Sequence, residues 1–178
     1  MLVAWRPFLS FGPALSLIQQ MDLREYFLKI YKYNLWANRK IMECLEVQEV
    51  NDEKVLAIFG HLVSAQFIWL NRFRDLPKSP YQLWGSYSLD ELRFMVEEAT
   101  RLWLEFIEEH NSFDRVLKYN NYVGNYYENK ISDIMIHLVN HGSYHRGQVA
   151  LLLRQKGYEP VNTDMITWER VITGQLND

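Results

Sequence analysis

Cysteine is nearly absent from this sequence of 178 residues, in which Cys44 is the only example. One cysteine cannot form an intramolecular disulfide, and chains without disulfides are typical of reducing compartments. We therefore expect a cytoplasmic protein. Cys44 falls inside a helical apolar pattern, which favours a small buried side chain over a reactive thiol.

A surplus of basic residues is also lacking. The net charge is −3, the isoelectric point is about 6.0, and lysine and arginine are scattered along the chain. Proteins that bind the phosphate backbone of nucleic acids usually carry a clustered basic surface. The composition therefore predicts no nucleic-acid partner.

The N-terminal stretch lacks an uninterrupted apolar run, because Pro7, Gly12 and Pro13 break the segment MLVAWRPFLSFGPALSLIQQ. A helix that spans a bilayer needs roughly 20 predominantly apolar residues, and no clear signal-peptide cleavage site follows here. A strong helical pattern begins directly after Met21. We expect residues 1–20 to be an N-terminal extension, residues 21–178 to form one domain, and no membrane partner.

Apolar and aromatic residues are plentiful, at 48% and 15% of the chain, which suits one compact core. Apolar residues recur at helical spacing in four long segments. These segments run from Asp22 to about Val47, from the cap at Asn51-Asp52-Glu53 to about Phe73, from Ser88 to about His110, and from Ile131 to about Lys156. The pattern predicts an all-α four-helix bundle.

Capping and turn residues support these boundaries. Ser88 and Glu91 have the spacing of a capping box, and Gly157 is suited to the position after a helix end. Residues 75–87 contain prolines and a glycine, which indicates a loop. The segment DRVLKYNNYVGNYYENK, residues 114–130, predicts a short hairpin or ordered crossover before the last long helix.

Three of the five histidines lie four residues apart in HLVNHGSYHRGQ, at positions 137, 141 and 145. Residues four apart on a helix lie about 40° apart around its axis, so His141 and His145 can converge on one ion. His137 and His145 are separated by about 12 Å along the axis, too far to share an ion. His141 and His145 both belong to a stripe that is otherwise apolar: Ile134, Leu138, His141, His145, Val149 and Leu152. His137 lies beside this stripe.

A third ligand is expected from the second helix, where His61 has small or apolar helical neighbours and should face inward. A buried neutral imidazole needs partners for two ring nitrogens, and three imidazoles that bind one Zn²⁺ or similar ion satisfy this need together. Three histidines also leave one position for water, as in catalytic zinc sites. The alternatives are a hydrogen-bonded core histidine at position 61 and a chance HxxxH spacing in the fourth helix.

The catalytic groups stay unidentified, because HGSYH lacks the glutamate that HExxH metalloproteases place between their ligands. Asp133 or Asn140 could orient a ligand imidazole. For Arg146 we expect an ion pair with an acid on a neighbouring helix, the alternative being an anionic substrate.

Three segments together resemble the DinB family: YNLWANRKIMECL, HLVSAQFIWLNR and HLVNHGSYHRGQVALLLRQKG. The similarity runs from about Met21 to the end of the chain and includes PVNTDMITW. It implies a bundle with up-down-down-up topology and a divalent metal, zinc or nickel, held by one histidine of the second helix and the HxxxH pair of the fourth. In this sequence those positions are His61, His141 and His145.

The resemblance also implies function. Relatives include S-transferases and isomerases that use low-molecular-weight thiols such as bacillithiol or mycothiol. Many others are described only as metal-dependent hydrolases or damage-inducible proteins, and dimers are frequent in the family. We therefore expect a metal-dependent enzyme that acts on a small molecule, as a homodimer. The alternatives are a non-catalytic metal-binding stress-related bundle and a DNA-associated stress protein, the latter opposed by the negative charge.

Overall fold

The computed structural model describes residues 22–76 and 78–178. The predicted extension, residues 1–20, lies outside the described residues, as does Met21. The elements follow in the order α1 (Leu23–Val47), α2 (Glu53–Phe73), α3 (Leu89–Glu109), β1 (Val116–Asn120), β2 (Tyr126–Lys130), α4 (Ile131–Gln155) and α5 (Met165–Ile172).

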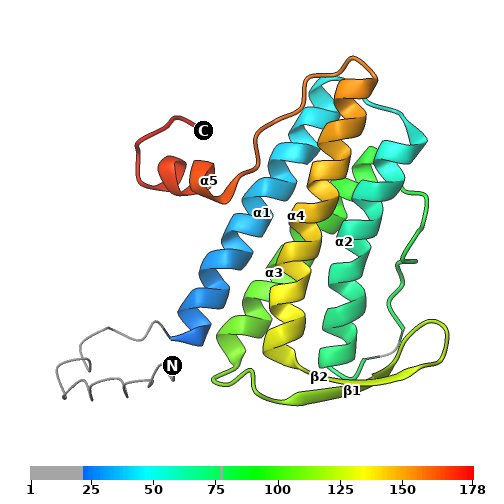
Figure 1. Ribbon diagram of the computed structural model, residues 1–178, viewed down its shortest axis with the longest axis vertical. Coiled ribbons are helices and arrows are strands. Elements are labelled where there is room, and N and C mark those ends of the chain that lie inside the picture. The colour runs from blue at the N-terminus through cyan, green and yellow to red at the C-terminus, as the bar shows by residue number, and fades with distance from the viewer. Residues whose placement is uncertain (1–21, 77) are drawn as a thin grey trace, which may run out of the picture.

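The long helices α1, α2, α3 and α4 form a bundle, which confirms the predicted fold class (Figure 1). The segment between α2 and α3 runs back along the bundle, so these two helices point the same way and the topology is up-down-down-up. Helix α1 packs mainly against α3, and α2 packs against both α3 and α4. The pair α2 and α4 forms the side of the bundle that carries the inward-facing histidines.

Side-chain caps determine where these helices begin. Asp22 accepts a hydrogen bond from the Arg24 amide at the start of α1, and Asp52 accepts one from Val55 in α2. The predicted capping box of α3 is present, with Ser88 as the cap. Such caps satisfy amides that the helix leaves unpaired, at about 1 kcal/mol each.

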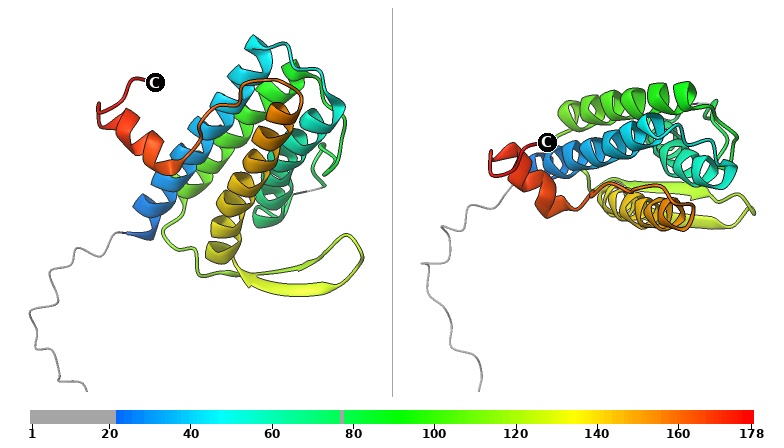
Figure 2. Two further views of the ribbon diagram at one scale, coloured as in Figure 1. Left: turned by 45° about the horizontal axis from the view of Figure 1, so that its top comes forward. Right: turned by 90° about the horizontal axis from the view of Figure 1, so that it is seen from above.

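The hairpin predicted before the last long helix is also present. Strands β1 and β2 pair antiparallel, with Val116 opposite Lys130 and Asn120 opposite Tyr126. The hairpin lies across the end of the bundle at which α2 ends and α4 begins (Figures 1 and 2). Its tip projects past the end of α2 toward the segment that connects α2 with α3.

The short helix α5 lies outside the bundle, beside α1 (Figure 2). Its buried residue is Trp168, whose ring centroid lies 6.0 Å from that of Tyr33. Within the described part of the chain, α2 is the one helix that is long and apolar enough to cross a membrane by composition. Of the most apolar stretch of 18 residues in this helix, 61% is buried inside the bundle, as in the core helix of a folded domain.

A buried arginine joins α4 to α1. Arg146 is 1% exposed, and its Nη1 atom donates to the side-chain oxygens of Asn34, at 2.8 Å, and Asn38, at 2.9 Å. Its Nη2 atom donates to the hydroxyl groups of Tyr33 and Ser143. The expected ion pair with an acid is therefore wrong, because the facing surface of α1 offers amide and hydroxyl oxygens instead of carboxylates.

Glycine is required at position 142, where the backbone of α4 lies close to the hydrogen-bonded side chains of Asn34 and Arg146. A Cβ atom at this position would lie 2.8 Å from Asn34 Oδ1 and 2.9 Å from Arg146 Nη1. Both atoms belong to buried side chains that are hydrogen-bonded to each other, so neither can move away cheaply. At Gly147, five residues further along α4, an added Cβ would meet nothing within 4 Å.

We predict opposite effects for the two glycine substitutions on this helix. Gly147→Ala should raise the free energy of unfolding by about 0.5–1 kcal/mol, because alanine favours helix and nothing is displaced. Gly142→Ala should lower it, because disturbing a buried hydrogen bond costs about 1–3 kcal/mol and outweighs the helical gain. Urea denaturation measures both; equal stabilisation by the two variants would contradict the role given to Arg146.

Candidate metal centre

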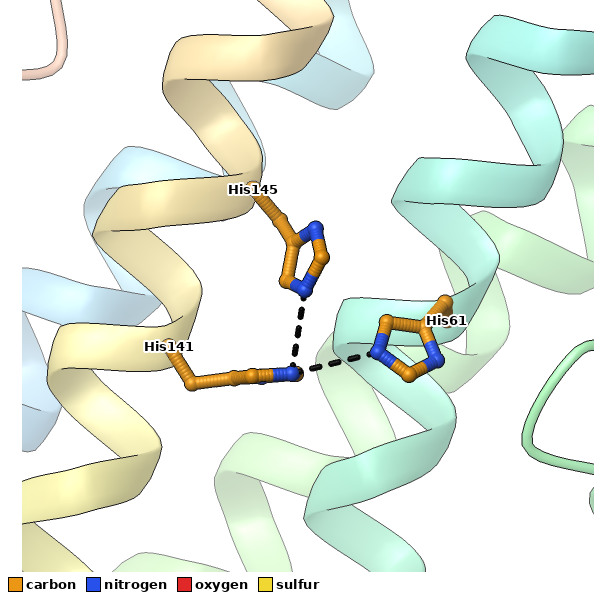
Figure 3. A group of neighbouring side chains, drawn as sticks. All are labelled: His61, His141 and His145. Carbon is orange, nitrogen blue, oxygen red and sulfur yellow. Dashed lines mark hydrogen bonds between the residues drawn. The ribbon is translucent and has the colours of Figure 1, made fainter.

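The three histidines predicted to bind metal lie together between α2 and α4. His61 projects from α2, and His141 and His145 project from successive turns of α4 toward it (Figure 3). The Nε2 atom of His141 lies 3.1 Å from that of His61 and 3.1 Å from that of His145. One possible ligand atom from each residue lies within 4.8 Å of the other two.

Hydrogen bonds on the far side of two rings fix the tautomers. His61 Nδ1 lies 3.0 Å from the carbonyl oxygen of Leu83, and His145 Nδ1 lies 2.7 Å from Oε1 of Gln148. Both oxygen atoms can only accept, so each Nδ1 carries a proton and donates it. In the neutral rings, the Nε2 atoms of His61 and His145 therefore present lone pairs to His141.

His141 cannot satisfy both of these lone pairs. Its Nε2 atom carries at most one proton and can donate to only one of the two neighbouring nitrogens. Its Nδ1 atom is buried without a hydrogen-bond partner in the described part of the chain. A cation that accepted all three Nε2 lone pairs would remove the conflict among these three nitrogens, and the proton of His141 would then lie on Nδ1. At the Nε2 atoms, the donor set fits a metal ion better than it fits a hydrogen-bonded core.

The spacing and burial of the nitrogens agree with this conclusion. Two nitrogens bound to one tetrahedral zinc lie about 3.3 Å apart, since zinc–nitrogen bonds are about 2.0–2.1 Å long. The two separations of 3.1 Å that involve His141 are close to this value. His61 and His145 are 7% and 8% exposed, which shields the nitrogens from water.

Burial also favours the neutral form of two of the imidazoles, those of His61 and His141. The pKa of His141 is lowered to about 3, mainly by burial and then by the neighbouring imidazoles of His145, His61 and His137, in that order. Burial lowers the pKa of His61 as well, although the hydrogen bond with Leu83 opposes this shift. A metal ligand must be neutral imidazole, so both shifts favour metal binding over proton binding at neutral pH.

The other histidines lie outside this group. His137 is exposed, and its ring centroid lies 5.5 Å from that of His141, at the edge position that the helical wheel predicts. His110 follows α3 and its Nδ1 atom lies 2.7 Å from the carbonyl oxygen of Phe106. The structure therefore brings together His61, His141 and His145 and leaves the remaining two out.

The groups that orient the ligand rings differ from those considered from the sequence. Asp133 and Asn140 are exposed, whereas the bonds to the rings come from Leu83 and Gln148. A backbone carbonyl in a loop leaves no side-chain signal. Gln148, however, lies three residues after His145 and so on the same helical face, a signal that the sequence contains.

A tryptophan and a cavity complete the surroundings. The Trp84 ring stacks on His61 at 3.7 Å between centroids and 9° between planes. A cavity of about 330 Å³, which we call the inner cavity, reaches His61 and His141. Its lining is otherwise largely aromatic and apolar: Ala65, Ile68, Trp69, Arg72, Leu83, Tyr119, Asn121, Tyr122, Tyr127 and His137.

Comparison with known proteins agrees with this architecture. The sequence profile of the DinB family matches residues 19–174 of this chain. The chain belongs to the DinB family. It is also 26% identical to Protein DinB of Bacillus subtilis (strain 168) over 159 residues, covering 80% of this chain and 92% of that protein. This DinB-family chain thus combines the bundle with three histidines that could hold a metal ion.

We predict that His141→Ala abolishes stoichiometric metal binding, because His141 contacts both other ligands, whereas His137→Ala leaves the metal bound. Elemental analysis of protein purified without an affinity tag measures the metal content of each. Equal loss in both variants would show that the ligand set has been assigned wrongly.

Gln148→Leu should weaken metal affinity about 10- to 100-fold, because the His145 ring loses the acceptor that fixes its orientation and tautomer. Competition with a chromophoric chelator gives the affinity. Asn140→Leu, an exposed change on the same helix, is the matched control and should bind metal like the unmodified protein. Unchanged affinity in Gln148→Leu would remove this residue from the site.

Proposed function

We propose that this protein is a metal-dependent enzyme in which His61, His141 and His145 hold a zinc or nickel ion and the inner cavity admits a small-molecule substrate. The observation that carries the proposal is that a cavity of about 330 Å³ ends at two of the three imidazoles. An ion that only fastened α2 to α4 would need no such cavity. Two reactions are compatible with this site, hydrolysis and transfer of a low-molecular-weight thiol.

The metal, when bound, would lower the pKa of a water molecule or stabilise a thiolate. Three histidine donors are the ligand number of catalytic zinc sites, whereas structural sites usually have four protein ligands. The protein's own part is to orient the rings of His61 and His145 and to keep those of His61 and His141 neutral. Trp84, stacked on His61, covers that ring on the loop side.

The cavity lining favours thiol transfer over hydrolysis. Neither aspartate nor glutamate is among the described residues that line the inner cavity, so hydrolysis would lack a carboxylate general base. A thiol loses its proton near pH 8.5 even in water and depends less on such a base. His137 lines the same cavity. Because it is not one of the proposed ligands, its imidazole could accept the thiol proton while the metal stays bound.

The test is whether an outside molecule reaches the metal. We expect the cobalt(II)-substituted protein to develop a thiolate-to-cobalt absorption band when 2-mercaptoethanol is added, and His141→Ala protein to show none. The metal-dependent transfer of the same thiol to 1-chloro-2,4-dinitrobenzene, with release of chloride and a proton, then reports turnover. If added thiols leave the cobalt spectrum unchanged while a chelator lowers the melting temperature sharply, the ion is structural and the proposal is wrong.

A further inference from the structure

A second cavity adjoins the inner one at the end of the bundle that carries the hairpin. This outer cavity has a volume of about 590 Å³ and lies between the end of α2, the tip of the hairpin, and residues 76 and 78–83. Both cavities are lined by Ile68, Arg72, Leu83, Asn121 and Tyr122. The two cavities therefore adjoin at these residues; we call them together the cleft, and its inner part reaches His61 and His141.

The charge of this cleft is opposite to that of the whole protein. The chain carries a net charge of −3, yet the described residues that line the cleft include Arg72 and Lys78 and neither aspartate nor glutamate. The other residues with polar side chains that line the outer cavity carry amides or hydroxyl groups: Asn71, Ser79, Tyr81, Gln82, Asn120, Asn121 and Tyr122. A cleft walled in this way favours a negatively charged ligand over a neutral or positive one.

Arg72 is held in place without a carboxylate partner. Its guanidinium carbon lies 4.6 Å from the ring centroid of Trp69, 5.0 Å from Tyr119 and 5.8 Å from Tyr122. Its Nη2 atom donates to the carbonyl oxygen of Asn120 at 3.4 Å. Across residues 22–76 and 78–178, no acidic side chain forms an ion pair with it. A guanidinium ordered by ring faces keeps N–H groups for an anion.

We propose that the outer part of this cleft binds a carboxylate or phosphate group of the substrate, and that Arg72 determines this specificity. The inference rests on the proposed function, because the same molecule places its reactive end at the histidines. Lys78 is exposed and lines only the outer cavity, so it contributes through charge at the entrance. Arg72, which lines both cavities, makes the direct contact.

Helix geometry sets the length of such a substrate. His61 and Arg72 are eleven residues apart on α2, a rise of about 16 Å between their Cα atoms. Arginine side chains on a helix point back toward its N-terminus, which brings the guanidinium nearer to the histidines. The reactive and anionic ends are therefore separated by on the order of 10 Å. This span corresponds to a molecule of dipeptide size or larger.

The experiment uses thiols that differ in length and charge as probes of the cobalt(II)-substituted protein. We expect 8-mercaptooctanoate to bind about tenfold more tightly than 8-mercaptooctanol, as an arginine–carboxylate contact provides. 3-Mercaptopropionate and 3-mercaptopropanol should bind alike, because neither spans the cleft. Titration of the thiolate-to-cobalt absorption band gives each dissociation constant without requiring turnover.

Substitutions of single basic residues distinguish the contact made by Arg72 from the effect of net charge. Arg72→Gln should reduce the preference for the long carboxylate to less than twofold with unchanged cobalt content, and Arg72→Lys should retain part of it. Arg154→Gln removes the same charge from an exposed site on α4 that lines a different cleft, and should keep the full preference. Lys78→Gln should have a smaller effect than Arg72→Gln.

The outcomes distinguish the two proposals. If no thiol alters the cobalt spectrum, the proposed function fails. If both long thiols bind at the metal with equal affinity, or if Arg72→Gln keeps the preference, the function stands and the anionic specificity is wrong. Loss of the preference in Arg154→Gln as well would attribute it to net charge and would also overturn the assignment of Arg72.

Discussion

The contact of Arg146 with α1 fixes the rotation of α4 about its own axis, and the site depends on that rotation. Neighbouring residues on a helix point about 100° apart, so holding Arg146 against Asn34 and Asn38 turns His145 toward α2. The buried guanidinium has neutral partners, and burial lowers its pKa, although the contact with Tyr33 opposes this. Breaking the contact would leave a buried charge unpaired, which costs several kcal/mol. The rotation is therefore strongly specified.

Much of the fold was predictable because it follows from local patterns. Helical spacing of apolar residues, the Ser88 capping box and the glycine after α4 each predict an element that is present. The grouping of His61 with the HxxxH pair was also predictable, since inward-facing stripes on two helices of one bundle must meet. The metal itself, the cytoplasmic location and the homodimer remain predictions.

The remaining features depend on contacts between distant segments. The sequence does not show that a loop carbonyl at Leu83 meets His61, because any residue has a carbonyl oxygen. It also does not show that the hairpin places the rings of Tyr119 and Tyr122 beside Arg72, since this requires the packing of β1 against the end of α2. The partners of Arg146 differ from the expected acid for a related reason: the amide oxygens of Asn34 and Asn38 meet the guanidinium only when α1 packs against α4.

The order of the ligands along the chain has a consequence for biosynthesis. His61 leaves the ribosome 80 positions before His141, and the hairpin that lies across the end of the bundle is made between them. A nascent chain that has completed α1, α2 and α3 carries one imidazole of the trio and exposes the face of α2 that α4 later covers. An ion held by the three histidines could therefore be captured only after α4 has been translated, and it would stabilise only chains that have reached that point.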